Sequence, residues 1–261
     1  MDNQTMRHRL IPCLLFALAA HASVAAEAPP DPLGSVQWAR YYDAYFSDGP
    51  VTFDPRVRVF APERAEDSMQ VPVTVDAREL GDVREMVVLA DYNPIPLVLR
   101  FKPQRAQPFI SFRIKLQQTS PIRVAARTAG GTWHVGGMWV DAAGGGCTLP
   151  SEASSKPDWT ARLGEIYGRL WPDDGNRQPL RVRMMHPMDT GLADQIPRFH
   201  IEDLVLRDAD GSELWSMQVY EPVSENPVFG FDLHGADLTA GPLELNGRDN
   251  NANRFLARFA P

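Results

Sequence analysis

The chain has 261 residues, 44% of them hydrophobic, and a formal net charge of -7 at pH 7. The length suits two small domains better than one, and the apolar content is enough for packed cores. The acidic balance argues against nucleic acid or anionic membranes as partners, because both attract basic proteins. Beyond the first 26 residues, no apolar run has the length needed to span a bilayer.

Residues 1–26 have the features of a secretory signal peptide. Arg7 and Arg9 precede an apolar run at 10–20, and the small residues Ala25 and Ala26 precede the expected cleavage site. The apolar run is too short to span a bilayer as a stable helix. We therefore expect export to the periplasm and removal of Cys13 with the signal.

Residues 36–141 predict a first β-sandwich. Hydrophobic residues alternate with polar or small ones at 71–75 and again at 110–114, which fits the period of a β-strand. Seven runs of strand length follow one another with turn residues between them, a spacing typical of an antiparallel, immunoglobulin-like β-sandwich. The runs are 57–60, 69–76, 83–91, 96–101, 109–116, 122–127 and 133–140.

Residues 142–179 are expected to connect two domains. They begin with a loop in which Gly144, Gly145 and Gly146 precede Cys147, and serine and proline residues follow. Such a composition gives a core little to hold and favours a flexible, exposed segment. We therefore interpret the three glycines as a flexible arm that carries the cysteine.

The second part of this connection predicts a helix at 158–170. Trp159, Leu163, Ile166 and Leu170 recur at helical spacing, Asp158 is a suitable N-cap, and a proline follows the expected end.

Residues 180–261 predict a second, smaller β-sandwich. A DADG sequence at 208–211 marks a hairpin between two of its strands. The expected strands are 180–186, 198–208, 213–220, 228–234, 242–249 and 254–259. The predicted fold is thus all-β, with two immunoglobulin-like sandwiches joined by a glycine-rich loop and one helix.

Cys147 is the only cysteine left after the signal peptide is removed. A lone cysteine is often a buried, inert side chain, but the flanking glycines favour an exposed thiol that forms reversible persulfides or disulfides. Asp141 and Glu152 would hinder its ionisation if they were near, whereas Lys156 and Arg127 would help. We therefore expect a thiol without strong activation. Because Cys147 has no second cysteine in the mature chain, a disulfide-linked dimer through it also remains open.

A metal site is the alternative suggested by His186 and Met188. Together with Cys147 and either His200 or His134 they would supply soft ligands suited to copper. A glycine-rich loop cannot hold rigid copper geometry, so we expect no metal and no cofactor. His186 and Met188 are then expected at the end of a strand or in docking a partner.

Several segments resemble the two subunits of the SoxYZ sulfur-oxidation carrier. Residues 184–211 and 223–233 resemble the Z subunit, with a His-Pro-Met pattern followed by Thr-Gly. The sequences MQVPVTVD at 69–76 and DYNPIP at 91–96, together with the Gly-Gly-Gly-Cys segment, resemble the Y subunit. A Y-like part followed by a Z-like part in one exported chain is similar to the fused SoxYZ-like carriers associated with quinoprotein dehydrogenases.

This resemblance implies a non-catalytic periplasmic carrier in which Cys147 covalently holds a sulfur species or a redox equivalent. It also implies partners among sulfur-oxidation or quinoprotein dehydrogenase enzymes and c-type cytochromes. One departure is that Thr148 follows the cysteine and a folded half of the chain continues after it. The loop at 142–157 is held at both ends, so its tip can reach roughly 25 Å at most.

Two other functions remain open. The chain could be a binding or assembly module that supports a periplasmic quinoprotein dehydrogenase, with an incidental thiol. A thiol-dependent redox enzyme is disfavoured, because a lone cysteine has no resolving partner for a dithiol cycle.

Overall fold

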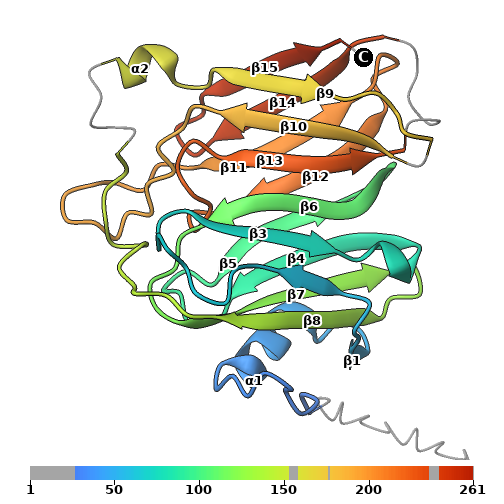
Figure 1. The fold of residues 1–261 in the computed structure, drawn as a ribbon, viewed down its shortest axis with the longest axis vertical. Coiled ribbons are helices and arrows are strands. Elements are labelled where there is room, and N and C mark those ends of the chain that lie inside the picture. The colour runs from blue at the N-terminus through green and yellow to red at the C-terminus, as the bar shows by residue number, and fades with distance from the viewer. Residues whose placement is uncertain (1–26, 153–157, 176, 235–240, 261) are drawn as a thin grey trace, which may run out of the picture.

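The computed structural model describes residues 27–152, 158–175, 177–234 and 241–260. The expected signal peptide at 1–26 and Lys156 lie outside these residues. Two β-sheets, one of nine strands and one of six, face each other across a hydrophobic core (Figure 1). The predicted β-sandwich architecture is confirmed.

Each sheet contains strands from both halves of the chain. Neighbouring strands are antiparallel, except that β1 and β8 are parallel. In spatial order, the nine-stranded sheet consists of β1 (Val51–Phe53), β8 (Trp133–Val140), β7 (Ser120–Thr128), β4 (Val83–Ala90), β5 (Leu97–Lys102), β12 (Glu213–Val219), β11 (Ile201–Arg207), β14 (Leu243–Asp249) and β15 (Arg254–Phe259). The six-stranded sheet consists of β2 (Arg58–Phe60), β3 (Val71–Asp76), β6 (Ala106–Ile114), β13 (Val228–Leu233), β10 (Gln178–Met184) and β9 (Ile166–Leu170).

The two halves are joined edge to edge through both sheets. Strand β5 pairs with β12, where Phe101 lies opposite Met217, and β6 pairs with β13, where Ile110 lies opposite Phe231. All four side chains belong to one buried hydrophobic cluster that extends through both halves. The halves therefore form a continuous sandwich, in addition to the chain connection at 142–179.

Short helices near the N-terminus add a layer on the outside of the nine-stranded sheet (Figure 1). Helix α1 (Trp38–Tyr41) and the π-helical turn η1 (Tyr42–Phe46) bury Trp38 and Phe46 against Trp133 of β8. A single 3-10 turn, η2, spans Arg78–Leu80. Within the described residues, every helix falls short of the length and apolar character needed to cross a membrane.

The predicted helix at 158–170 is mostly wrong. Helix α2 has only one turn (Trp159–Arg162), and Gly164 follows it with a positive φ of 78°. The next residues form β9, in which Ile166, Gly168 and Leu170 lie opposite inward-facing residues of β10. Spacing by four residues fits one helical face, but it also fits one face of a strand. Pairing with β10 decides between them.

Candidate functional site

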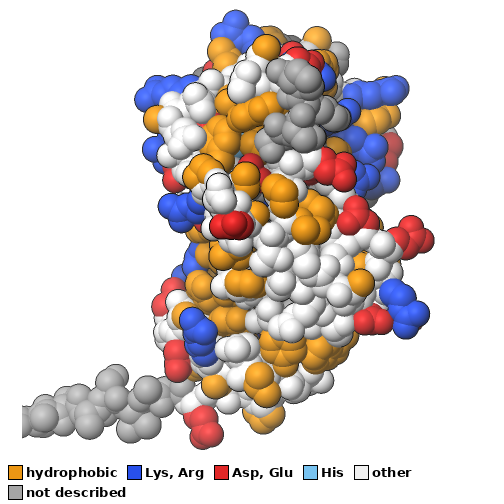
Figure 2. Space-filling view, turned by 90° about the vertical axis from the view of Figure 1, so that its left-hand side faces the viewer, with side chains coloured by type: hydrophobic (Ala, Val, Ile, Leu, Met, Phe, Trp, Pro, Cys, Tyr) orange, Lys and Arg blue, Asp and Glu red, His pale blue; other side chains and the backbone are white. Residues whose placement is uncertain are grey.

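Cys147 belongs to the loop that follows β8. This loop runs along the end of the molecule shown on the left in Figure 1. Its side chain is only 1% exposed, and its Sγ lies 3.8 Å from the carbonyl oxygen of Lys115. Figure 2 looks onto this end, where hydrophobic and uncharged atoms cover much of the middle and charged side chains lie mainly toward the edges. The prediction of an exposed thiol is therefore wrong for this structure.

The segment before the thiol is held by hydrogen bonds to the residues that follow β6. The backbone N–H groups of Gly145 and Gly146 donate to the carbonyl oxygens of Gln117 and Leu116 at 3.1 and 3.0 Å. The N–H of Cys147 donates to the side-chain oxygen Oε1 of Gln117 at 3.2 Å. The arm, defined here as residues 142–152, is thus docked against the first half of the protein.

The glycines allow this close docking. A Cβ atom on Gly146 would lie 2.2 Å from the carbonyl oxygen of Ser68 and 2.8 Å from that of Leu116. Gly144 has a φ of +96°, and a Cβ there would lie 2.7 Å from the carbonyl oxygen of Gln117. The interpretation as a purely flexible arm is corrected accordingly. Close approach of two backbones also requires glycine.

The second half of the protein covers the docked arm. In the loop after β10, the hydroxyl of Thr190 donates to the carbonyl oxygen of Cys147 at 2.6 Å. The neighbouring Asp189 accepts a hydrogen bond from the backbone N–H of Ser151 at 3.0 Å. The cysteine is therefore enclosed between the two halves, and each half supplies contacts to it.

Lys115 is buried beside the thiol and is 1% exposed. Its Nζ donates to the carbonyl oxygens of Met188 and Glu221, the latter at 3.2 Å. Burial lowers the pKa of Lys115 to about 8, although the acidic groups Cys147, Asp189, Glu225 and Glu221 oppose this shift. Sequence reasoning missed this residue because it placed Lys115 inside the predicted strand at 109–116, whereas β6 ends one residue earlier, at Ile114.

Burial raises the pKa of the Cys147 thiol to about 11, and the positive charge of Lys115 only partly opposes this shift. In this buried position the thiol is therefore protonated at neutral pH and is a weak nucleophile. Two of the side chains considered for tuning it are engaged elsewhere, since Asp141 pairs with Arg64 and Arg127 pairs with Asp48.

His186 and Met188 shape the turn that covers Lys115. They are 1% and 0% exposed, so neither side chain is available for docking a partner in this structure. The Nδ1 of His186 accepts a hydrogen bond from the N–H of Met188 at 3.1 Å, and Met188 adopts a positive φ of 54°. This turn brings the Met188 carbonyl to the ammonium group of Lys115.

Of the possible copper ligands, His134 is engaged with another residue. Nδ1 of His134 lies 2.8 Å from a carboxylate oxygen of Asp54 instead. Across residues 27–152, 158–175, 177–234 and 241–260, no group of three His, Cys, Asp or Glu side chains could hold a metal ion. A disulfide between two chains through Cys147 would likewise require the arm to open, because the thiol is buried.

Comparison with known proteins divides the chain into two parts, with the boundary inside the connection at 142–179. Residues 42–147 match the family described as sulfur oxidation protein SoxY, and residues 172–260 match sulphur oxidation protein SoxZ. No curated protein matches the chain. Among solved structures, the sulfur carrier protein SoxY from Chlorobium limicola f thiosulfatophilum is 25% identical, with a TM-score of 0.35, over 40% of this chain and 93% of that one.

The SoxY match ends at Cys147, and the SoxZ match contains Met188, Asp189, Thr190 and Glu221. The contacts that enclose the thiol therefore join the SoxY-like region to the SoxZ-like region. The two matches, in this order in one polypeptide, show that the chain is a fused SoxYZ-like protein of the sulfur-oxidation carrier families.

Proposed function

We propose that this protein is a periplasmic, non-catalytic carrier in which Cys147 covalently holds a sulfur species or an oxidising equivalent between partner enzymes. In this proposal the structure represents a closed state, with the thiol stored between the two halves. Partner enzymes load and unload the thiol after the arm has opened.

The observation that carries this proposal is the way in which the arm is held. Among residues 142–152 there is no strand or helix. The arm is fastened by loop contacts, such as those of Gly146 with Leu116 and of Cys147 with Thr190. Releasing these contacts leaves the strand pairing of both sheets intact. Local opening of such a segment costs less free energy than unfolding the sandwich.

The raised thiol pKa gives the closed state a protective role. A buried, protonated thiol reacts slowly, and exposure to water returns its pKa toward the ordinary value. The open thiolate then attacks the outer sulfur of a persulfide on a partner. The donor's S–S bond breaks, its electron pair leaves on the donor thiolate, and a new S–S bond forms at Cys147. The exchange needs no external oxidant.

The proposed location and partners have separate support. The signal-like sequence at 1–26 supports export to the periplasm. The SoxY and SoxZ matches support partners among sulfur-oxidation enzymes. The resemblance to fused carriers suggests a quinoprotein dehydrogenase and c-type cytochromes in the same pathway.

Alkylation kinetics combined with intact-mass spectrometry test the proposal. Protein isolated without reductant is expected to carry additions near 32 Da or its multiples on Cys147, which are lost on reduction and are absent from Cys147→Ser. Alkylation of the natural chain is expected to be slow, to reach completion, and to depend only weakly on urea, because only the arm opens. A urea dependence equal to that of global unfolding, together with an unmodified mass, would overturn the proposal.

The burial of Cys147 favours a second candidate, a binding or assembly module that supports a quinoprotein dehydrogenase. A cysteine that is never exposed acts only as a small hydrophobic side chain. In that case Cys147→Ser would support dehydrogenase activity in cells as well as the natural chain does. A carrier would lose its function with the same substitution.

A further inference from the structure

Four exposed arginines lie on the outer face of the six-stranded sheet, and we call them the arginine surface. They come from three strands, and those on β6 and β10 alternate with buried neighbours such as Val182 and Ile114. The four residues are Arg113 on β6, Arg169 on β9, and Arg181 and Arg183 on β10.

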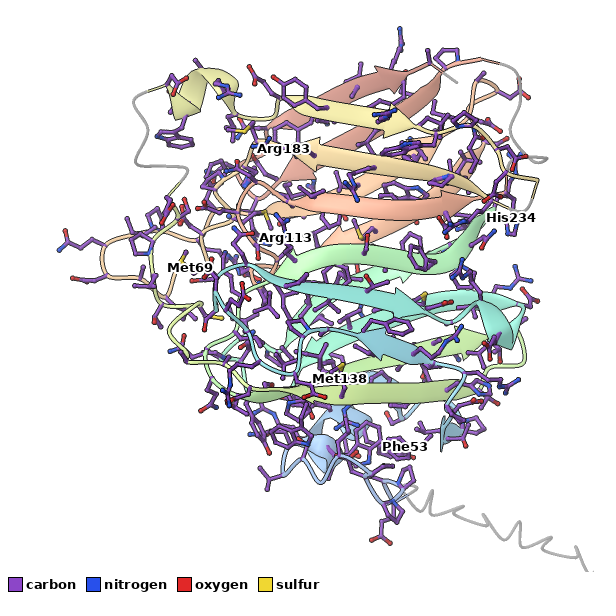
Figure 3. All side chains as sticks on the ribbon, in the orientation of Figure 1. Phe53, Met69, Arg113, Met138, Arg183 and His234 are labelled. Carbon is purple, nitrogen blue, oxygen red and sulfur yellow. The ribbon has the colours of Figure 1, made fainter. Side chains whose placement is uncertain are left out.

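The strand register places these arginines together. Arg181 lies opposite Arg169 on β9, and Arg183 is the next outward residue along β10. Strand β13 separates β10 from β6, and Arg113 lies two residues beyond Ser111, which pairs with β13. Figure 3 shows Arg113 and Arg183 toward the end of the sheet at which Met69 also lies.

The arginine surface concentrates positive charge on one face of the sheet. Among the residues that the structure describes, no carboxylate forms an ion pair with any of the four. By contrast, carboxylates of the same sheet pair with other arginines: Asp76 with Arg58, and Asp232 with Arg78 and Arg177. Four unpaired positive charges stand out on a protein with a net charge of -7. Such a local patch attracts negatively charged partners.

Aromatic side chains border these arginines. The ring of Trp171 lies 4.8 Å from the guanidinium carbon of Arg169 and 6.0 Å from that of Arg181. Tyr167, opposite Arg183, is 56% exposed. Trp171 and Arg181 also line a shallow groove of about 360 Å³. Arg, Trp and Tyr are the residues that contribute most often to binding at protein interfaces.

This arrangement fits a protein better than the other anionic occupants. A small anion needs convergent donors in an enclosed site, whereas these arginines are spread over an open sheet face. A second copy of the chain would bring a net charge of -7 toward another -7, which long-range repulsion disfavours. The aromatic residues supply the contact area that a protein surface uses.

We propose that the arginine surface is the docking surface for an acidic region of another protein. Arg113 is two residues before Lys115, and Arg183 is three residues before His186, so a docked protein would lie beside the closed Cys147 site. This last consequence rests on the proposed carrier function. Docking itself does not require the thiol.

Binding of fluorescently labelled poly-L-glutamate tests the proposal, because this probe is an acidic polypeptide without other features. The natural chain is expected to bind it, with affinity falling as salt increases. The double substitution Arg113→Glu and Arg183→Glu is expected to weaken binding by about tenfold or more. Cys147→Ser is expected to bind normally, so failure of this test would leave the thiol chemistry untouched.

A matched control reverses two exposed arginines elsewhere. Arg40→Glu with Arg254→Glu makes the same change in net charge, and its binding is expected to stay within about twofold of the natural chain. Equal losses in both double variants would overturn the proposal. It would also be overturned by binding to phosphatidylglycerol vesicles in place of poly-L-glutamate, or by self-association that the Arg113 and Arg183 changes abolish. Thermal unfolding checks that each variant is folded. The neutral pair Arg113→Gln and Arg183→Gln removes the two positive charges without adding negative ones, and it is also expected to weaken binding.

Discussion

Arg123 and Lys115 are both fully buried cations in the SoxY-like half, but their charges are compensated differently. The guanidinium of Arg123 makes two hydrogen bonds of 2.9 Å to Asp31 and one of 2.8 Å to Asp91. It also lies 4.5 Å from the ring centre of Trp38. The Lys115 ammonium instead donates to two backbone carbonyls.

The difference suggests that Arg123 has a structural role, whereas Lys115 lies where a negative charge could be accommodated. Two carboxylates beside Arg123 compensate its charge through direct hydrogen bonds, so the cluster ties the N-terminal segment to β7. Carbonyl dipoles satisfy the hydrogen bonds of Lys115 without neutralising it, and a protonated thiol lies next to it. A negative charge that forms on sulfur at Cys147 would therefore be stabilised by an ammonium already in place.

The largest expected effect comes from breaking the Arg123 cluster. Arg123→Met should lower the free energy of unfolding by about 3–5 kcal/mol, because Asp91 would remain buried without a cation. Urea unfolding followed by circular dichroism measures the loss. Arg127→Met on the same strand is the control, since its ion pair with Asp48 is partly exposed and contributes about 1 kcal/mol or less. Equal losses would contradict the comparison.

The next effect concerns access to the thiol. Gly146 does not have a positive φ, so alanine is acceptable to its backbone, but a Cβ would meet the carbonyls of Ser68 and Leu116. Gly146→Ala should therefore undock the arm and speed alkylation of Cys147 by about tenfold or more, equivalent to about 1.4 kcal/mol of closing free energy. Leu149→Ala is the control, because this side chain in the same arm is 53% exposed. An unchanged rate in Gly146→Ala would show that the arm opens by another route.

The sequence alone was enough to predict most of the strands. Alternation such as Val71, Val73 and Val75 arises because one face of a strand is buried, and the structure buries all three side chains. Pairing between β5 and β12 could not be predicted, since those strands are more than a hundred residues apart and nothing in either one specifies its neighbour. The predicted helix at 158–170 was too long for a related reason, because pairing of 166–170 with β10 outweighs the helical spacing of those residues.

The candidate site was only partly predictable. The choice of Cys147 as the candidate residue followed from its position beside three glycines and from its being the lone cysteine after the expected signal peptide. Its burial did not, because glycine serves both flexible segments and closely packed backbones, and only the carbonyls around Gly146 distinguish the two. Lys115 gave no signal at all, since the end of a strand cannot be located to one residue from alternation.

The smallest expected effect is the pH dependence that sets Lys115 apart from Arg123. Between pH 8 and its unperturbed pKa of 10.5, Lys115 has released a proton that the unfolded chain still binds, so stability rises with pH. Cys147 acts in the opposite direction between pH 9 and 11, because its native form keeps a proton that the unfolded chain has lost. The net rise should therefore be confined to pH 8–9 and amount to at most about 1.4 kcal/mol.

Substitutions at the two residues separate these contributions. Lys115→Met should remove the rise between pH 8 and 9, whereas Cys147→Ser should extend it toward pH 10.5, because the opposing thiol is gone. Lys102→Met, at an exposed position, should keep the rise and serves as the control. Urea unfolding at a series of pH values measures each profile. A rise that persists in Lys115→Met would mean that this ammonium is not held in a poorly compensated environment, and its contrast with Arg123 would then disappear.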